Sequence, residues 1–557
     1  MKKIILFGLI ILIAGAALWI GRTPYRHWKQ KHFLAEAREF LAKSDYRNAV
    51  LSARKTLEVN PANVEASRIM AKITEQFKFS EAIYWRHRIV DLEPNVVQNQ
   101  LDLARAALLL GNQREADEAL RGVKASDRNR ADFHEIAALL AVAENNIPAA
   151  EAQASVAAKL EPQNKSLQLN LAVLDVQSKN KQLVNAAKSS LEALSADPAY
   201  RREALRQLAV AAVREGDFAK GETFAQQLQQ EKPPLFGDEL LNLGILKEAG
   251  SANFAACLAS MKIEAEKDPE QISVLSGWLM GQHMTDQALD WLLGLPDKTR
   301  QEQPVVVALA DCYAARHDWA RMQSLLADRN WADSDFLRLA LLSRALREQH
   351  DDLAAQADWH TAITSASGHR QPLAALVRLA NAWGWDREKE EAAWLLVQRF
   401  PGEDWALAML DHLYAAHGNT RGLQKVYSAL MKNEPADVMA KNNFAAVSLL
   451  LGLRLPEAHQ IAQENYAHFP QDAVITSTYA YSLHLQGRTQ EGLKLLEKLP
   501  EDKLRLPTVA TYYGVLLAVV GQPAKAKPYF EIAAQSNLLP EEKALVAAAQ
   551  KSSPARK

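Results

Sequence analysis

The sequence has little of what disulfide-linked, metal-binding or nucleic-acid-binding proteins depend on. Cysteine occurs only twice in 557 residues, as Cys257 and Cys312, and the chain has no C-x-x-C unit. This usage indicates neither a disulfide framework nor a structural zinc site. An excess of one charge is also lacking, because 65 Lys and Arg stand against 66 Asp and Glu, for a formal net charge of -1. We therefore expect no nucleic-acid partner.

The short motifs of common enzymes are missing as well. The chain has no G-x-x-x-x-G-K phosphate loop, no G-x-G-x-x-G turn, no G-x-S-x-G elbow and no H-E-x-x-H helix. Its 14 histidines are scattered, and His412 and His417 would lie about 140° apart around a helix. The sequence thus predicts no catalytic residue, no cofactor and no metal, and a protein that is not an enzyme.

One apolar run stands at the start of the chain. Lys2 and Lys3 precede the uncharged residues 4–20, which as a helix would rise about 26 Å, at the short end of what spans a bilayer. The A-x-A form of residues 14–16 leaves a cleaved signal peptide as the alternative. The run predicts a single-pass membrane protein whose anchor and juxtamembrane segment occupy residues 1–30.

The side of the membrane that carries the remaining chain is ambiguous. Basic residues after the run outnumber the two before it, which favours the cytoplasm. A start with two lysines followed by an apolar segment is also typical of an exported signal anchor. We expect the periplasmic or extracytoplasmic side.

Beyond the apolar run, prolines recur with a period close to 34 residues. Pro61 and Pro94 are 33 residues apart, and Pro162 follows after twice 34. A similar spacing of prolines recurs at Pro401, Pro435 and Pro470. Because proline ends helices and the stretches between are amphipathic, each period is expected to be a helical hairpin.

A shorter turn divides each period in two. Examples are Ser44-Asp45, Gly216-Asp217 and His317-Asp318, each followed by an aromatic residue. A small or polar residue would end the first helix, and the aspartate would cap the second. One hairpin cannot bury its apolar face alone, so neighbouring hairpins must stack.

These residues resemble the tetratricopeptide repeat family. Asn242-Leu243-Gly244 opens one unit, Ala458 stands at the tight helix crossing of another, and Pro435 and Pro470 end units as that family does. The resemblance implies an all-α fold: a right-handed superhelical solenoid of stacked hairpins, preceded by the transmembrane helix. It divides the chain into a repeat array at 31–270, irregular Trp-rich repeats at 271–384, a second array at 385–545 and a flexible tail at 546–557.

In that family the first helix of each hairpin lines a concave binding surface. The resemblance assigns to that surface the position just before the family's Leu-Ala or Leu-Gly pair. Aligned here, that position is Asp102, Asn170, Gln207, Asn242, Asn443, Thr478 and Tyr512. Amide side chains there could bond an extended peptide backbone, since they donate and accept at once. A solvated position without a binding role is the plainer interpretation.

Aromatic residues are concentrated in the middle of the chain, where nine of the 12 tryptophans lie between Trp278 and Trp405. Trp383 and Trp385 are the candidates for an exposed aromatic interface. Packing between hairpins is the alternative role for the same side chains.

The resulting hypothesis is a membrane-anchored scaffold that binds proteins or peptides in an envelope process such as assembly, secretion or polysaccharide export. Two alternatives stay open. One is a glycan-binding or enzymatic solenoid that uses the Trp-rich middle, and the other is a strut that self-associates.

Overall fold

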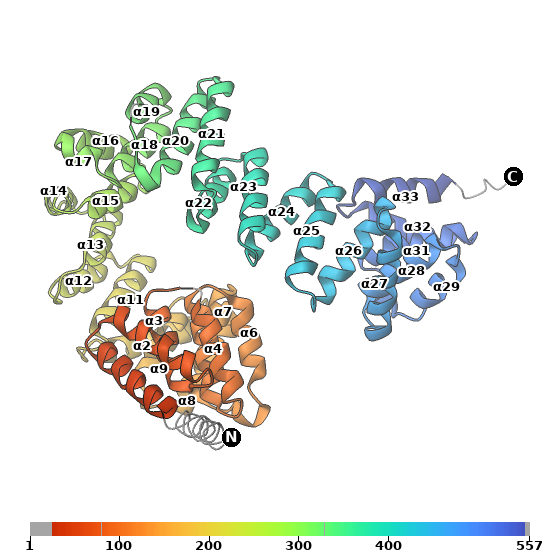
Figure 1. Ribbon diagram of the computed structural model, residues 1–557. Coiled ribbons are helices and arrows are strands. Elements are labelled where there is room, and N and C mark those ends of the chain that lie inside the picture. The colour runs from red at the N-terminus through yellow and green to blue at the C-terminus, as the bar shows by residue number, and fades with distance from the viewer. Residues whose placement is uncertain (1–24, 80, 328, 552–557) are drawn as a thin grey trace, which may run out of the picture. The chain divides into compact units, whose positions relative to one another are not determined.

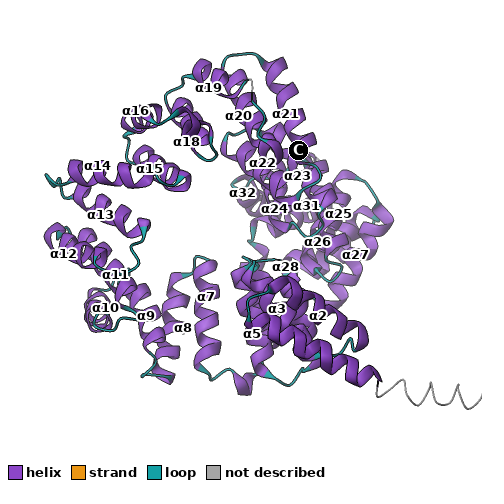
Figure 2. Ribbon diagram, turned by 60° about the vertical axis from the view of Figure 1, so that its left-hand side comes forward, coloured by secondary structure: helices purple, strands orange, loops and turns teal. Residues whose placement is uncertain are grey.

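The computed structural model describes residues 25–551 apart from positions 80 and 328, and all of its regular structure in that range is helical. Antiparallel helical hairpins stack one after another, as Figures 1 and 2 show. The chain falls into two compact parts, unit 1 up to Gln271 and unit 2 from Ile272. The all-α fold of stacked hairpins predicted from the sequence is confirmed, and the right-handed sense of a superhelix stays a prediction.

Unit 1 is built from short helices joined by tight turns. They comprise helical residues 25–42, α2 (Tyr46–Val59), α3 (Val64–Gln76), α4 (Glu81–Leu92), α5 (Val97–Leu109), α6 (Gln113–Gly122), the 3-10 turn η1 (Ala125–Asp127), α7 (Ala131–Ala143), α8 (Ile147–Leu160), α9 (Lys165–Asp175), α10 (Lys181–Leu194), α11 (Arg201–Arg214), α12 (Phe218–Gln229), α13 (Phe236–Glu248) and α14 (Phe254–Ala265).

Helix α15 (Pro269–Gly281) crosses the boundary, and unit 2 continues from it. Its other elements are α16 (Thr285–Gly294), α17 (Asp297–Gln301), α18 (Val305–Ala315), α19 (Trp319–Leu326), η2 (Ala332–Ser334), α20 (Asp335–Glu348), α21 (Asp352–Ala366), α22 (Arg370–Ala382), α23 (Asp386–Arg399), α24 (Asp404–Ala416), α25 (Thr420–Asn433), α26 (Val438–Leu451), α27 (Leu455–His468), α28 (Ala473–Leu485), α29 (Thr489–Leu496), α30 (Glu501–Leu504), α31 (Pro507–Val519), α32 (Pro523–Ala534) and α33 (Pro540–Lys551). The sequence divided this part at 384/385, whereas both predicted segments lie in unit 2.

The turn inside each hairpin forms as its residues predict. Ser44, Gly216 and His317 have φ of 58°, 80° and 56°, which reverses the chain. The next residue caps the second helix: Asp45 Oδ1 accepts from the Asn48 amide at 3.2 Å, and Asp217 does the same for α12. The turn of each of these hairpins is therefore set by residues within or beside it.

Small residues allow the two helices of a hairpin to approach closely. Ala458, which the sequence places at such a crossing, is completely buried. At Gly492 a Cβ would lie 2.5 Å from the carbonyl oxygen of Ala480, so no larger residue fits there without movement of the backbone.

Two sequence predictions need correction. No helix within the described ranges 25–79, 81–327 and 329–551 is long and apolar enough to cross a membrane, so the predicted single-pass membrane localisation is not supported. Residues 4–20, which carried that prediction, lie outside the described residues. The predicted flexible tail at 546–557 was also wrong up to Lys551, because Val546 packs against the core and Ala549 is buried in α33.

Candidate functional site

A groove of about 610 Å³ opens in unit 1 beside α7, α8 and α9. Its floor is apolar and buried, formed by Ala138, Ala154, Ala157 and Leu167. Its wall is also apolar, formed by Leu139, Val142, Ile147, Leu169, Val173 and Leu174. We call this site the unit 1 groove.

The wall exposes more apolar surface than folding alone requires. Leu139, Val142 and Ile147 keep 45%, 42% and 38% of their surface exposed. Leu139 and Val142 lie three residues apart on α7 and so share one face. Ile147 joins them because it is the first residue of α8, directly after the cap that Asn146 makes with the Ala149 amide. Contiguous exposed apolar side chains with a polar rim are typical of interaction sites.

Polar side chains stand at the rim of the groove. The Asn170 amide nitrogen donates to Glu135 Oε1 at 3.4 Å, and Arg105 Nη2 donates to Glu135 Oε2 at 3.2 Å. This links α5, α7 and α9. Because the Asn170 bond is long, its amide can be drawn to a ligand at little cost. Asn170 is the predicted residue that the structure places in the unit 1 groove.

A second predicted residue lies near the same groove. Gln207 donates from Nε2 to Glu203 Oε1 at 2.9 Å on its own helix α11, and Glu203 lines the groove. Arg206 Nη1 donates to the same carboxylate at 3.2 Å. Gln207 therefore orients a rim carboxylate rather than facing the groove itself.

Two further predicted residues in unit 1 bond to neighbouring helices. Asp102 accepts from Arg86 Nη1 at 2.8 Å, across to α4, and from Gln98 at 2.9 Å. Asn242 is 7% exposed and donates to Cys257 Sγ at 3.7 Å. Asn242 also lines a separate hollow of about 760 Å³ beside α12, α13 and α14.

The predicted residues of unit 2 do not form an open site. Asn443 is half-buried on α26. Thr478 is 3% exposed, and its hydroxyl donates to the Val474 carbonyl at 3.1 Å within α28. Tyr512 is 6% exposed and is covered by α33. Thr478 and Tyr512 are therefore buried positions, and Asn443 is a half-buried one.

The two aromatic candidates belong to a packed cluster. Trp385 is 8% exposed and Trp383 packs on the same core; their ring centroids lie 4.9 Å apart. Arg347 covers the Trp385 ring at 3.8 Å, and Arg344 lies 5.2 Å from the Trp383 ring centroid. An exposed interface role for Trp385 is wrong, because its ring packs on the core and a guanidinium covers it.

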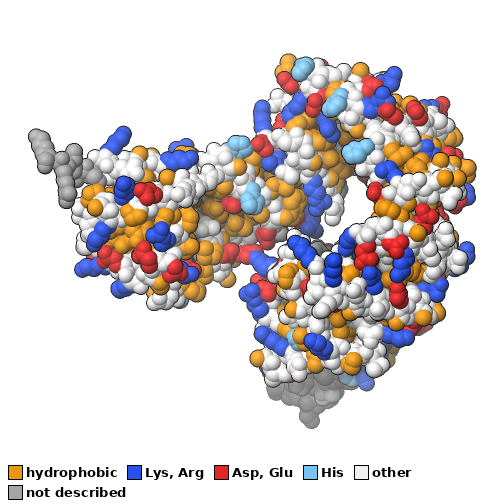
Figure 3. All heavy atoms as spheres, turned by 180° about the vertical axis from the view of Figure 1, so that it is seen from behind, with side chains coloured by type: hydrophobic (Ala, Val, Ile, Leu, Met, Phe, Trp, Pro, Cys, Tyr) orange, Lys and Arg blue, Asp and Glu red, His pale blue; other side chains and the backbone are white. Residues whose placement is uncertain are grey.

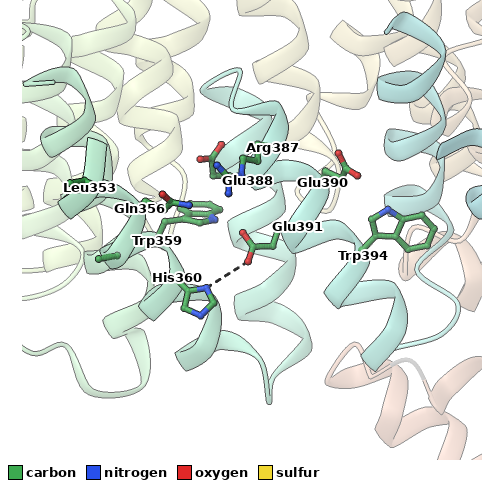
Figure 4. A pocket seen from close by; sticks show the side chains of 10 residues that line it. Leu353, Gln356, Trp359, His360, Arg387, Glu388, Glu390, Glu391 and Trp394 are labelled. Atoms are coloured by element: carbon green, nitrogen blue, oxygen red, sulfur yellow. Dashed lines mark ion pairs between the residues drawn. The ribbon is translucent and has the colours of Figure 1, made fainter. Parts of the chain in front are cut away.

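A polar hollow of about 730 Å³ lies between α21 and α23 in unit 2 (Figure 4). His360 and Glu391 point toward one another from the two helices, at 3.7 Å. The other carboxylates are engaged as well: Glu388 pairs with Arg347, and Glu390 accepts from the Tyr414 hydroxyl at 2.6 Å. Glu388, Glu390 and Glu391 are therefore each held by a partner side chain.

A metal-ligand cluster and the two thiols are further candidates for chemistry in the described part of the chain. Within residues 25–551, positions 80 and 328 apart, no three His, Cys, Asp or Glu side chains are placed to hold a metal ion. Burial raises the pKa of Cys257, and it raises the pKa of Cys312 to about 12, so both thiols stay protonated at neutral pH. On the face that Figure 3 draws, positive and negative side chains are interspersed.

Sequence reasoning missed the apolar wall of the unit 1 groove. Leu139 and Val142 fall in an almost wholly apolar stretch of α7, where periodicity does not distinguish a buried side chain from an exposed one. It also missed Asp238, which is 2% exposed and accepts from Arg202 and Arg206 at 2.5 and 2.6 Å. That ion pair joins α11 to α13 across 36 residues, and no local sequence pattern predicts it.

Comparison with known proteins gives likenesses of the fold only. No family model matches the chain, and no curated protein does. Among solved structures, Pseudomonas aeruginosa PilF is 14% identical over 40% of this chain and 99% of its own, with a TM-score of 0.33. PilW, a type IV pilus biogenesis factor, is 18% identical over 44% of this chain and 98% of its own, with a TM-score of 0.28.

A tetratricopeptide repeat protein from Parabacteroides merdae is likewise similar, at 14% identity over 51% of this chain and 98% of its own, with a TM-score of 0.25. At such identities and TM-scores these likenesses carry no function to this chain.

Proposed function

We propose that the protein is a non-catalytic scaffold that binds a segment of a partner protein in the unit 1 groove. The observation that carries this proposal is the exposed wall of Leu139, Val142 and Ile147 above a buried floor. Apolar side chains of a bound segment would cover the wall. Its backbone would meet the amide of Asn170, and the carboxylates of Glu135 and Glu203 would lie at its edge.

The lining of the groove suits a peptide segment with apolar side chains. Its lining is chiefly apolar, and its carboxylates are already held by Arg105 and Arg206. Such a site gains affinity mainly from burial of side chains, at about 1.5–3 kcal/mol for each large one. The expected role in an envelope process stays a prediction.

Selection of peptides by the full-length chain tests the proposal. A displayed library of peptides of about 15 residues is panned against the wild-type protein, and the recovered peptides are titrated against Leu139→Asp and Val142→Asp. Both side chains are already exposed, so the variants should fold. We expect their affinity to fall about 10-fold or more, because a charge replaces an apolar contact.

The matched control is Ile263→Asp, which changes an equally apolar side chain of unit 1 that is 66% exposed and lies outside the groove. Its affinity should equal that of the wild type. Peptides that bind wild type, L139D and V142D equally well would place binding elsewhere and refute the proposal.

A further inference from the structure

The C-terminal helix α33 packs on hairpins that are distant from it in sequence. Pro540 lies against Gly418, where an added Cβ would be 3.1 Å from the proline ring. The Thr420 hydroxyl donates to Glu541, 121 residues further along the chain. A helix that merely closed the stack would contact the last hairpin alone. Instead, α33 extends from the turn before α25 across α26 and α31 (Figure 1).

The face that α33 covers is aromatic and carries hydroxyl groups. The Tyr512 hydroxyl donates to Glu542 Oε1 at 2.9 Å, and the Tyr481 ring lies beside the Tyr512 ring, tilted by 38°, with centroids 4.9 Å apart. Leu545 packs against the cluster that contains both tyrosines. Burial raises the pKa of Tyr512 well above its ordinary value, so the hydroxyl stays a donor. We call this face the unit 2 groove.

One side of α33 stays in solvent, because Lys543, Ala544 and Ala547 are exposed whereas Ala549 is buried. A 12-residue helix is marginal by itself in water, so α33 stays helical through its contacts. Helix α31 forms its hairpin with α32 and not with α33. Release of α33 would therefore leave that hairpin paired.

We propose that the unit 2 groove binds a helix of a partner protein, and that α33 occupies the groove until that helix displaces it. The partner helix would begin with two consecutive acidic residues, and an apolar pair would follow three and four residues after the second. Thr420 and Tyr512 would donate to the acidic residues, as they do with α33. The first apolar residue would pack on the cluster that contains Tyr481, as Leu545 does, and the second would pack on the neighbouring core, as Val546 does. This inference concerns unit 2 alone and does not depend on the unit 1 groove.

A labelled synthetic peptide of residues 537–551 serves as the probe for the full chain, with fluorescence anisotropy as the readout. In Leu545→Asp, α33 should leave the groove, because a carboxylate replaces a packed leucine. We expect the peptide to bind L545D about 10-fold or more tightly than wild type, where the tethered helix competes. Leu353→Asp, at a side chain 84% exposed in unit 2, is the matched control and should behave as wild type.

Two further changes test the chemistry of recognition. Adding Thr420→Val and Tyr512→Phe to L545D removes both hydroxyl donors and should weaken peptide binding about 10-fold. A peptide with glutamine at positions 541 and 542 should weaken by a similar factor. A second release variant of the full chain, Glu541→Gln with Glu542→Gln, loosens α33 without touching its apolar contacts.

Equal affinity of wild type and both release variants would overturn the proposal. So would absence of binding to L545D when hydrogen exchange shows α33 released. Wild-type dimers that form with rising concentration and disappear in L545D would overturn it in favour of exchange of α33 between copies.

Discussion

The two units are built from the same kind of hairpin, but an apolar face that stays exposed in unit 1 has a counterpart in unit 2 that is covered by a helix of the same chain. In unit 1 the wall of Leu139 and Val142 stays exposed, whereas in unit 2 Tyr481 and Tyr512 are 5% and 6% exposed beneath α33. Leaving apolar area in water costs about 25 cal/mol per Å². In unit 1 this apolar area stays exposed, and a bound partner would bury it. In unit 2 helix α33 already buries the corresponding area, so a partner that bound there would compete with α33.

The units also differ in how closely the two helices of a hairpin approach each other at a glycine. A Cβ at Gly492 in unit 2 would meet the Ala480 carbonyl oxygen at 2.5 Å. A Cβ at Gly221 in unit 1 would first meet Val213 Cγ2 at 3.0 Å, the end of a side chain that can move. The α28–α29 hairpin beneath the filled groove thus tolerates less change than the α11–α12 hairpin of unit 1.

Replacing these glycines by alanine should produce the largest difference between the units. Alanine favours helix over glycine by about 1 kcal/mol, which offsets mild crowding. Gly221→Ala should therefore change the free energy of unfolding by less than about 1 kcal/mol. Gly492→Ala forces backbone apart and should lower it by about 2–3 kcal/mol. Urea unfolding followed by tryptophan fluorescence reports chiefly on unit 2, and hydrogen exchange reports on both. Equal losses would contradict the difference in packing.

The hairpins could be predicted because their signals are local. Asp45 and Asp217 cap helices within three residues of themselves, and Pro61 and Pro94 each follow a helix end. The grooves could not, because exposure depends on how successive hairpins meet. Asn170 was predicted from its position in the repeat, but nothing in the local sequence distinguished it from Asn443, which occupies the same repeat position on α26.

The occupied groove of unit 2 was beyond sequence reasoning for a further reason. Residues 546–557 have the composition of a solvated tail, and the contact that holds α33 joins Thr420 to Glu541 over 121 residues. Such a contact has no periodicity to reveal it. Its acidic pair is the part that sequence could have singled out, because a helix begins there.

Removing one hydrogen bond should have a larger effect on stability in the unit 2 groove, which α33 fills, than in the open unit 1 groove. Tyr512→Phe removes a bond to a carboxylate, and the opening free energy of α33 should fall by about 1.5 kcal/mol. Asn170→Ala removes a bond of 3.4 Å beside an open groove and should change the stability of α9 by less than about 0.5 kcal/mol. Hydrogen exchange of both helices checks this. Comparable changes at both sites would mean that α33 is held by its apolar contacts alone.

The smallest expected effect is a response to acid that has opposite signs in two helices, α4 of unit 1 and α28 of unit 2. In unit 1 the hydrogen bond with Glu115 raises the pKa of His87, and Asp91 and Glu118 act in the same direction. A raised histidine pKa stabilises the fold fully below the unfolded value of about 6.5, and this contribution is lost as pH rises through the folded value. Because the His87 side chain is 48% exposed, the gain from pH 7.5 to 5.5 should stay below about 1 kcal/mol.

In unit 2 burial lowers the pKa of His484, whose Nδ1 lies 2.9 Å from Thr489 Oγ1. A lowered histidine pKa has the opposite consequence, because the unfolded chain takes up a proton near pH 6.5 while the folded chain resists it. Acidification from pH 7.5 to 5.5 should therefore stabilise α4 and destabilise α28, as hydrogen exchange corrected for intrinsic rates would show. His87→Gln should abolish the first response. His484→Gln should reduce the second, and the remainder comes from His459, whose pKa burial also lowers and whose Nδ1 lies 2.7 Å from Ser482 Oγ on α28. A response of the same sign in α4 and α28 would contradict this difference between the two histidines.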